Sequence, residues 1–322
     1  MPPQNFKMQS SEIESKVKIF AGEASKYLAK EIALEYGVDL GLAKTFHFND
    51  GEMQPVINES IRGDYVFIVQ STFAPADNIM ELLLMIDSAR RASADYITAV
   101  VPYFGYARQD RKDKPRVSIA SKMVANLLTA AGANRVMTMD LHAPQIQGFF
   151  DIPVDHLESN TIFIPYLKEL NLPDMTFASP DVGSTNRARI LAQHFEKEMV
   201  IVDKHRKRPG EIAGMTLIGD VTGRNVILVD DIIDTATTLC NAAALLIDKG
   251  ANSVRAMCTH PVLSGNAIDK IENSKMTELV VCNTIPLRKF SPKIKVLSVA
   301  PLFASAIRNM HEHKSISSLF IN

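Results

Sequence analysis

The sequence has little cysteine and no long apolar run. Its 322 residues include three cysteines and no Cys-x-x-Cys pair, which argues against a disulfide scaffold or a cysteine-ligated zinc site and favours a reducing compartment. No apolar stretch approaches the ~18 residues of a membrane span. The segment 1–18 is polar and mixed in charge, which is typical of neither a signal peptide nor a transit peptide. We therefore expect a cytoplasmic protein without a membrane segment.

An excess of charge of one sign is missing as well. The 35 basic residues nearly balance 36 acidic ones, leaving a formal charge of −1, and aromatic residues make up only 7%. This balance argues against a partner held by bulk electrostatics, and the aromatics are too sparse for stacking of single-stranded nucleic acid. No nucleic-acid partner is expected. The hydrophobic share of 46% is ordinary for a globular protein with a sizeable core.

Short β-branched apolar runs alternate with amphipathic stretches along the chain, a pattern typical of an α/β fold with largely parallel sheets. The length suits about two domains. Residues 63–70 and 223–230 are similar at a constant offset of 160, and the helix and strand that follow are similar at nearly the same offset. This similarity favours a duplicated domain, although any two α/β units look alike at this level.

The predicted elements give the organisation of the chain. We place an N-terminal extension at residues 1–17, an N-terminal α/β domain at 18–158 and a C-terminal α/β domain at 159–322, whose last helix packs back on the N-terminal domain. Ser25 and Ser118 are expected to cap helices that end at glycines. The predicted strands are residues 16–20, 65–70, 96–101, 135–139, 175–179, 199–203, 225–230, 253–259, 278–281 and 295–299.

A first chemical motif lies at residues 226–238. A buried parallel strand ends in Asp230 and Asp231, at the edge where α/β sheets bind ligands. The next turn opens a helix, whose backbone N–H groups suit a phosphate, while the paired carboxylates suit two hydroxyls or a hydrated magnesium ion. The motif predicts a sugar-phosphate site; the alternative is a turn with acidic caps. The turn consists of Asp234, Thr235, Ala236, Thr237 and Thr238.

A second motif, at residues 138–155, follows another apolar strand. Asp140 and His142 lie at the end of that strand, and Asp151 and Asp155 follow them. His142 is a candidate metal ligand or a hydrogen-bond partner of a phosphate, and the aspartates are candidates to hold magnesium or orient its waters. A histidine beside a strand is more often structural, and the residues alone leave both interpretations open.

Two cationic segments are candidates for polyphosphate binding. Five basic residues lie within 108–116, soon after a predicted strand. Every residue from 204 to 208 is Lys, His or Arg. Such side chains can clamp a polyphosphate, and Pro209 and Gly210 favour a loop that would serve as a cationic lid. Solvated surface charge is the alternative for both segments.

Residues 46–52 are ambiguous in the same way. Phe48, with the nearby Asp50 and Glu52, could bracket a purine ring and accept from its exocyclic amine. A hairpin turn at residues 49–51 explains the same residues equally well.

Together these segments resemble the ribose-phosphate pyrophosphokinase family, also called phosphoribosyl pyrophosphate synthetases. Residues 140–155, Asp-Leu-His-Ala-x-Gln-Ile-Gln-Gly-Phe-Phe-Asp-Ile-Pro-Val-Asp, are similar to the family signature, and residues 58–63, 106–110 and 229–235 also match. The resemblance extends over nearly the whole chain. It implies an α/β fold of two similar phosphoribosyltransferase-type domains with largely parallel sheets.

The resemblance implies a ribose-phosphate diphosphokinase of nucleotide biosynthesis. Such an enzyme transfers the β,γ-diphosphoryl group of ATP to the 1-hydroxyl of ribose 5-phosphate, giving phosphoribosyl pyrophosphate and AMP, with Mg²⁺ as cofactor. A homo-oligomer, commonly a hexamer, is also implied. The alternatives are a phosphoribosyltransferase, which shares only the loop at 230–238, and a catalytically silent regulatory homologue, which would be expected to have lost the lid cations or the histidine.

The resemblance also implies a role for each motif residue. Lys204 and Arg206 would be catalytic, closing over the transferring group. Asp230 and Asp231 would bind the ribose hydroxyls, and the loop Asp234, Thr235, Ala236, Thr237 and Thr238 would cradle the 5-phosphate. ATP would contact Arg108 and Gln109, with its adenine held by Phe48, Asp50, Gly51 and Glu52 of a neighbouring subunit. The metal would lie at His142 and Asp181, and Asp140 of the second motif is a further candidate ligand.

Two positions depart from the family pattern. Thr237 replaces the glycine of Asp-Thr-x-Gly-Thr, and its Cβ would crowd the phosphate or strain a positive-φ backbone, while its hydroxyl could add a donor. After Asp181 the family commonly has Gly-Gly-x-x-Arg, whereas residues 183–187 here keep only one glycine.

Overall fold

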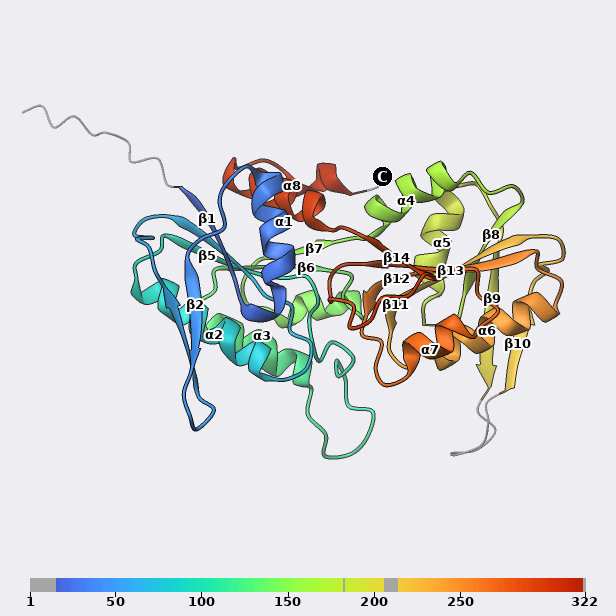
Figure 1. Ribbon diagram of the computed structural model, residues 1–322, viewed down its shortest axis with the longest axis horizontal. Helices are drawn as coiled ribbons and strands as arrows, with labels where there is room; N and C mark the ends of the chain where they lie inside the picture. Colours follow the sequence, from blue (N-terminus) through green and yellow to red (C-terminus); the bar gives the residue numbers. More distant parts are fainter. Residues whose placement is uncertain (1–15, 182, 206–213, 321–322) are drawn as a thin grey trace, which may run out of the picture.

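Two sheets of mostly parallel strands, with helices on their faces, make up the computed structural model (Figure 1), which describes residues 16–181, 183–205 and 214–320. The first sheet has the order β1-β4-β5-β6-β7, and all its strands are parallel. Its strands are β1 (Val17–Ala21), β4 (Tyr65–Val69), β5 (Tyr96–Val101), β6 (Arg135–Met139) and β7 (Val154–Leu157). Its helices are α1 (Lys26–Tyr36), α2 (Asp77–Arg91) and α3 (Ala120–Ala131).

The second sheet has the order β10-β9-β8-β11-β12-β13-β14, and only the edge strand β10 is antiparallel to its neighbour. Its strands are β8 (Met175–Ser179), β9 (Met199–His205), β10 (Gly214–Ile218), β11 (Asn225–Ile233), β12 (Ser253–Pro261), β13 (Glu278–Cys282) and β14 (Ile294–Leu297). The helices of this half are α4 (Asn160–Leu170), α5 (Thr185–His194), α6 (Thr237–Asp248), α7 (Ala267–Glu272) and α8 (Ala300–His311).

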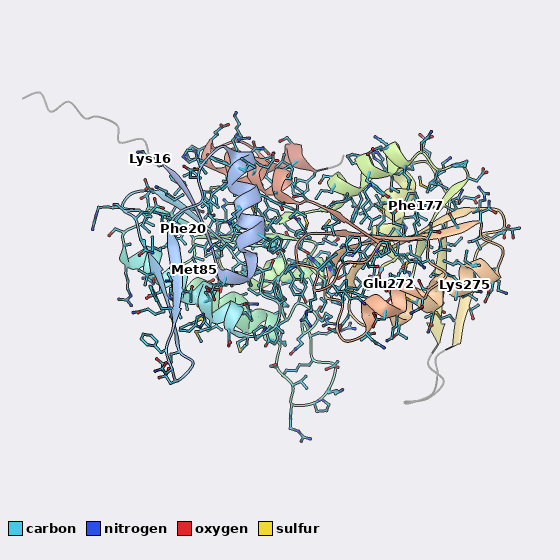
Figure 2. The ribbon with its side chains drawn as sticks, viewed as in Figure 1. Lys16, Phe20, Met85, Phe177, Glu272 and Lys275 are labelled. Atoms are coloured by element: carbon cyan, nitrogen blue, oxygen red, sulfur yellow. The ribbon has the colours of Figure 1, made fainter. Side chains whose placement is uncertain are left out.

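A shared core joins the two halves. One apolar cluster contains Phe67 of β4, Phe177 of β8 and Phe303 of α8, all fully buried, so side chains from both sheets pack together. The outer face of each sheet has a cluster of its own. Figure 2 shows Phe20 and Met85 in the interior of the first half and Phe177 in that of the second.

The predicted α/β class with largely parallel sheets is confirmed, and each predicted strand overlaps an observed one. The sequence missed the strands β7, β10, β2 (Ala43–His47) and β3 (Met53–Ile57), which are short or half-exposed and so lack a continuous apolar run. Strands β2 and β3 form an antiparallel hairpin, whose turn was one of the two interpretations of residues 46–52. None of the described helices is long and apolar enough to cross a membrane.

Both predicted helices end at the expected glycines, Gly37 and Gly132, and Ser25 occupies the N-cap position of α1, but neither predicted serine makes a capping bond. The hydroxyl oxygen of Ser25 accepts a hydrogen bond from the Ser71 N–H at 2.7 Å instead of capping α1. Helix α3 begins at Ala120 after Ile119, without a side-chain cap. Tertiary hydrogen bonding therefore outweighed the local capping preference at Ser25.

The division at residues 158 and 159 stays a prediction. It lies between β7 and α4, and α8 packs against α1 of the first half. Most of the predicted extension 1–17 lies outside the described residues.

Candidate functional site

Two neighbouring cavities lie at the carboxyl ends of the strands, and residues of both halves line the inner one. The inner cavity, of about 430 Å³, is lined by the β11–α6 turn at 230–239, by residues around the start of α5, and by Arg108 and His142 of the first half. The loop cavity, of about 590 Å³, is lined by Arg108 to Arg111, other loop residues and His142. Because Arg108 and His142 line both, the two cavities meet at these side chains.

Asp230 and Asp231 of β11 carry different charges although they are adjacent. Burial, followed by the neighbouring Asp231 charge, raises the pKa of Asp230 to about 8. Burial acts in the same direction on Asp231, but the hydrogen bond with His142 and the charge of Arg187 outweigh it and lower its pKa to about 2. At neutral pH the pair therefore offers both a hydrogen-bond donor and a carboxylate, which matches hydroxyl groups that accept and donate.

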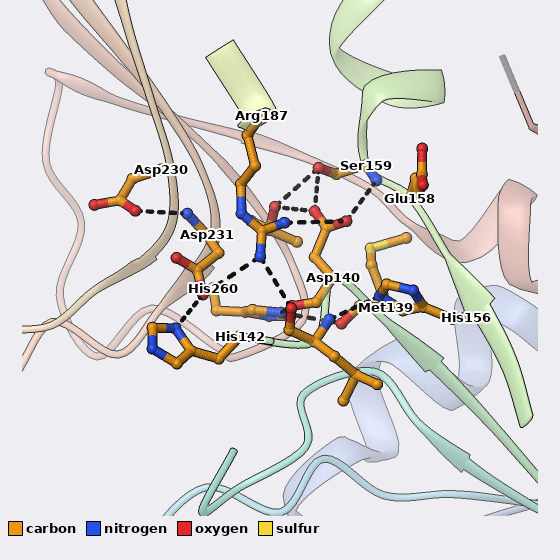
Figure 3. A network of polar contacts seen from close by, with 12 residues as sticks. Met139, Asp140, His142, His156, Glu158, Ser159, Arg187, Asp230, Asp231 and His260 are labelled. Carbon is orange, nitrogen blue, oxygen red and sulfur yellow. Dashed lines mark hydrogen bonds and ion pairs between the residues drawn. The ribbon is translucent and has the colours of Figure 1, made fainter. Parts of the chain in front are cut away.

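His142 lies in the loop after β6, with its Nδ1 atom 2.7 Å from Asp231 Oδ2. This hydrogen bond raises the pKa of His142 against the opposing effect of burial. A carboxylate that holds one ring nitrogen fixes the orientation of the other, as in histidines that ligate metals. Figure 3 shows the pair together with Arg187, whose guanidinium donates to Leu141 O at 2.9 Å and lies 3.7 Å from Asp231.

Asp140 lines neither of these two cavities, although it lines a smaller one nearby, and hydrogen bonds already engage its carboxylate. Its buried carboxylate accepts hydrogen bonds from the hydroxyl groups of Ser159 and Thr259, and Arg187 lies 3.9 Å away (Figure 3). Strand β6 turns at Asp140 in the left-handed region, at φ 37°, and this turn aims the side chain at the second half. We do not retain Asp140 in the candidate metal site.

Asp181 remains a candidate metal ligand. It lines the inner cavity, and its Oδ1 atom accepts the Ser184 N–H at 2.9 Å. Across the described residues, no group of three or more His, Cys, Asp or Glu side chains is arranged to hold a metal ion. A metal here would therefore need ligands from water or substrate.

The turn 234–238 lies at the N-terminus of α6, as predicted, but the expected strain at Thr237 is wrong. The left-handed residue is Ala236, at φ 59°, and Thr237 is not among the residues with positive φ. Thr237 Oγ1 accepts a hydrogen bond from Lys270 Nζ at 2.8 Å, and Lys270 also donates to Thr235 O at 3.2 Å. Arg108 Nη1 pairs with Asp234 Oδ2 at 2.9 Å across the two halves.

The structure does not bring the predicted adenine-binding residues to either cavity of the same chain. Phe48, Asp50, Gly51 and Glu52 form the tip of the β2–β3 hairpin, which extends away from the second half (Figure 1). Phe48 is 51% exposed. The hairpin interpretation is confirmed, because the Phe48 N–H donates to Glu52 O at 2.8 Å and Gly51 has φ 96°.

The two predicted catalytic residues are only partly described. Lys204 lies in β9, paired with Met215 of β10, so it belongs to a strand and not to a loop as predicted. The side chain of Lys204, and all of Arg206, lie outside the described residues. Gln109 lines the loop cavity, where it was expected.

Sequence reasoning missed three residues of this region: Ser184, Arg187 and Lys270. Ser184 and Arg187 lie in the first turn of α5 and contact the Asp230–Asp231 pair. Lys270 reaches the 234–238 turn from α7. The sequence analysis singled out residues 183–187 for their missing glycine, but it did not predict a contact with Asp230 or Asp231. Nothing in the sequence links Lys270 with Thr237.

Comparisons with known proteins agree on one family. Residues 17–132 match the model of the N-terminal domain of ribose phosphate pyrophosphokinase, and residues 180–321 match that of the phosphoribosyl synthetase-associated domain. The ribose-phosphate pyrophosphokinase of Wolinella succinogenes is 56% identical over 94% of this chain and 99% of its own length. That of Porphyromonas gingivalis is 52% identical over 95% and 98%. The crystal structure of phosphoribosylpyrophosphate synthetase from Mycobacterium smegmatis, at 38% identity, superposes with a TM-score of 0.88 over 93% of this chain and 100% of that chain.

Proposed function

The chain belongs to the ribose-phosphate pyrophosphokinase family, and from this premise we propose that the inner cavity binds ribose 5-phosphate and the loop cavity binds the phosphates of ATP. The enzyme is a diphosphotransferase that makes phosphoribosyl pyrophosphate and AMP from these substrates. The observation that carries the assignment is the meeting of the two cavities at Arg108 and His142. Substrates bound in this way would have a sugar hydroxyl next to a polyphosphate.

The sugar side uses both carboxylates and the helix terminus. Asp230 and Asp231 bind the ribose hydroxyls, because a pair with one proton can accept from and donate to them. Backbone N–H groups at the start of α6, together with the hydroxyls of the 234–238 turn, bind the 5-phosphate. Lys270, held at Thr237, adds positive charge at the edge of this site.

The nucleotide side is open and needs a second chain. Arg108 and Gln109 contact the phosphates, since both line the loop cavity. The hairpin tip with Phe48, Asp50, Gly51 and Glu52 lies away from this cavity, so the adenine is held by the hairpin of a neighbouring subunit. A homo-oligomer, a hexamer by family resemblance, supplies that neighbour.

The residues present fit a magnesium ion. Asp181 offers the oxygen ligand that Mg²⁺ prefers, and His142 lies at the same cavity. The described residues do not form a closed set of protein ligands, which suits an ion that keeps waters and phosphate oxygens around it. The chemistry that Mg²⁺ supplies when bound is neutralisation of phosphate charge.

The chain itself positions the reactants and neutralises charge. Phosphoryl-type transfer needs in-line placement more than covalent help, so we assign no general base. Lys204 and Arg206 stabilise charge that develops on the transferring group and the leaving oxygen. Closure of their segment over ATP would exclude water and so limit hydrolysis. We place this activity in the cytoplasm, as the low cysteine content suggests.

The test is an assay of the purified chain with ATP, Mg²⁺ and ribose 5-phosphate. We expect AMP and phosphoribosyl pyrophosphate in equal amounts, and no AMP without the sugar. A phosphoribosyltransferase would instead consume phosphoribosyl pyrophosphate with a base, and a silent homologue would yield no product. Either result, or AMP release without the sugar, would contradict the proposal.

A further inference from the structure

Ser184 makes two contacts that a helix-capping serine would not ordinarily combine. It occupies the N-cap position of α5, where a serine oxygen normally accepts from the backbone of the first turn, yet its side chain makes no capping bond. Its hydroxyl instead donates to Asp230 Oδ1 at 2.7 Å, and its own N–H donates to Asp181 Oδ1 at 2.9 Å. Ser184 is only 5% exposed, so both bonds are shielded from solvent.

Asp230 and Asp231 are held by different kinds of partner. Asp231 lies 2.7 Å from His142 and 3.7 Å from Arg187, two cationic or ionisable side chains. Asp230 Oδ1 accepts from Ser184 Oγ and from the Asp231 N–H at 2.9 Å. Among the described residues, the Ser184 hydroxyl is thus the side chain that donates to Asp230 Oδ1 and fixes the plane of this carboxyl group beside the charged Asp231.

We propose that Ser184 is a positioning residue that sets Asp230 for the ribose hydroxyls and so determines the affinity for ribose 5-phosphate. The inference rests on the proposed role of the inner cavity in binding the sugar. Ser184 acts through Asp230 and not on the nucleotide, because its hydroxyl is committed to that carboxylate. Its effect is therefore selective for one of the two substrates.

The first experiment compares Ser184→Ala with Ser184→Thr. Loss of this buried hydrogen bond to the Asp230 carboxyl group is expected to raise the KM for ribose 5-phosphate about tenfold. The KM for ATP should stay within about twofold, and kcat should change less than the sugar KM. Ser184→Thr keeps the hydroxyl and should restore the wild-type sugar KM. An unchanged sugar KM in Ser184→Ala, or an equal rise in both KM values, would overturn the proposal.

Controls separate this inference from its premise. Ser305→Ala removes a hydroxyl on α8 that bonds Pro301 O of the same helix at 2.8 Å, and it should leave both KM values unchanged. Asp230→Asn should raise the sugar KM; if it does not, the proposed sugar site itself fails. If Asp230→Asn raises the sugar KM and Ser184→Ala does not, only the role of Ser184 fails.

A binding measurement makes the test independent of turnover. Calorimetric titration of the oligomer with ribose 5-phosphate alone should show about tenfold weaker binding for Ser184→Ala, with a melting temperature close to the wild type. Ser184→Gly repeats the test should the alanine variant not fold. Equal affinities of the wild type and the folded variant would contradict the inference.

Discussion

The inner cavity and the loop cavity differ in how far one chain builds them. In the inner cavity, the side chain of Asp231 is 6% exposed and is held by His142 and Arg187. In the loop cavity, Arg108 is 50% exposed, and the hairpin expected to complete the site lies elsewhere. A preorganised, buried site loses affinity when one support is removed, whereas an open site depends on its ligand and on the neighbouring subunit. The two sides of one reaction should thus respond differently to mutation.

The largest expected effect concerns the proposed catalytic residue Lys204. Lys204→Ala should lower kcat about 10²–10³-fold, the scale of losing one donor to the transition state, with little change in either KM. Steady-state kinetics provide the measurement. Lys275→Ala, which removes a surface lysine paired with Asp248, is the matched control. Near-normal turnover of Lys204→Ala would contradict the catalytic assignment.

The next largest effect is expected in the inner cavity, the preorganised site. Asp231→Asn should raise the KM for ribose 5-phosphate roughly 10²-fold, because it removes the charge that holds His142 and Arg187. The KM for ATP should rise much less. Comparable rises in the KM values for ribose 5-phosphate and ATP would show that the two cavities do not act separately.

The open side is tested through the hairpin. Phe48→Ala should raise the KM for ATP about tenfold through loss of stacking, and leave the sugar KM unchanged. If the hairpin serves a neighbour, mixed oligomers of Phe48→Ala and Asp230→Asn chains should recover activity. Their hybrid sites combine an intact hairpin with an intact cavity. Failure to recover activity in verified mixed oligomers would place the adenine site within one chain.

A smaller effect is expected at the edge of the sugar site. Lys270→Ala should raise the KM for ribose 5-phosphate about threefold, less at high salt, since its charge is exposed. In a Thr237→Gly background the same change should matter less, because the Thr237 hydroxyl holds Lys270 in place. Additive effects in this double-mutant cycle would argue against the coupling.

The smallest effect concerns His260, which contacts residues of both halves. His260 is buried, with Nε2 3.2 Å from Met139 O and Nδ1 2.9 Å from Thr284 Oγ1, and burial lowers its pKa. The unfolded chain therefore binds a proton that the folded chain does not, so stability should be full above the ordinary histidine pKa and fall as the pH drops below it. Denaturant unfolding between pH 8 and 5 measures this slope. His260→Gln should flatten it, and an unchanged slope would contradict the assignment.

The sequence predicted what is local. The strand that ends in Asp230 and Asp231 and the turn that opens α6 are contiguous, so an apolar run followed by polar residues identifies both. The hairpin turn at 49–51 was also readable, because Gly51 supplies the left-handed backbone that the turn needs. At Ser25 the same kind of local rule failed, because Ser71 lies close in space and not in sequence.

By itself, the sequence determined the fold class, the family and which strands end in candidate functional residues, because strand periodicity and sequence motifs are properties of neighbouring residues. Only the tertiary structure decided which side chains the motif residues contact. It turned Asp140 toward Ser159 and Thr259, and it brought Ser184 to Asp230. The physical reason is that a buried polar side chain must be satisfied by whatever donor the packing of distant strands places beside it.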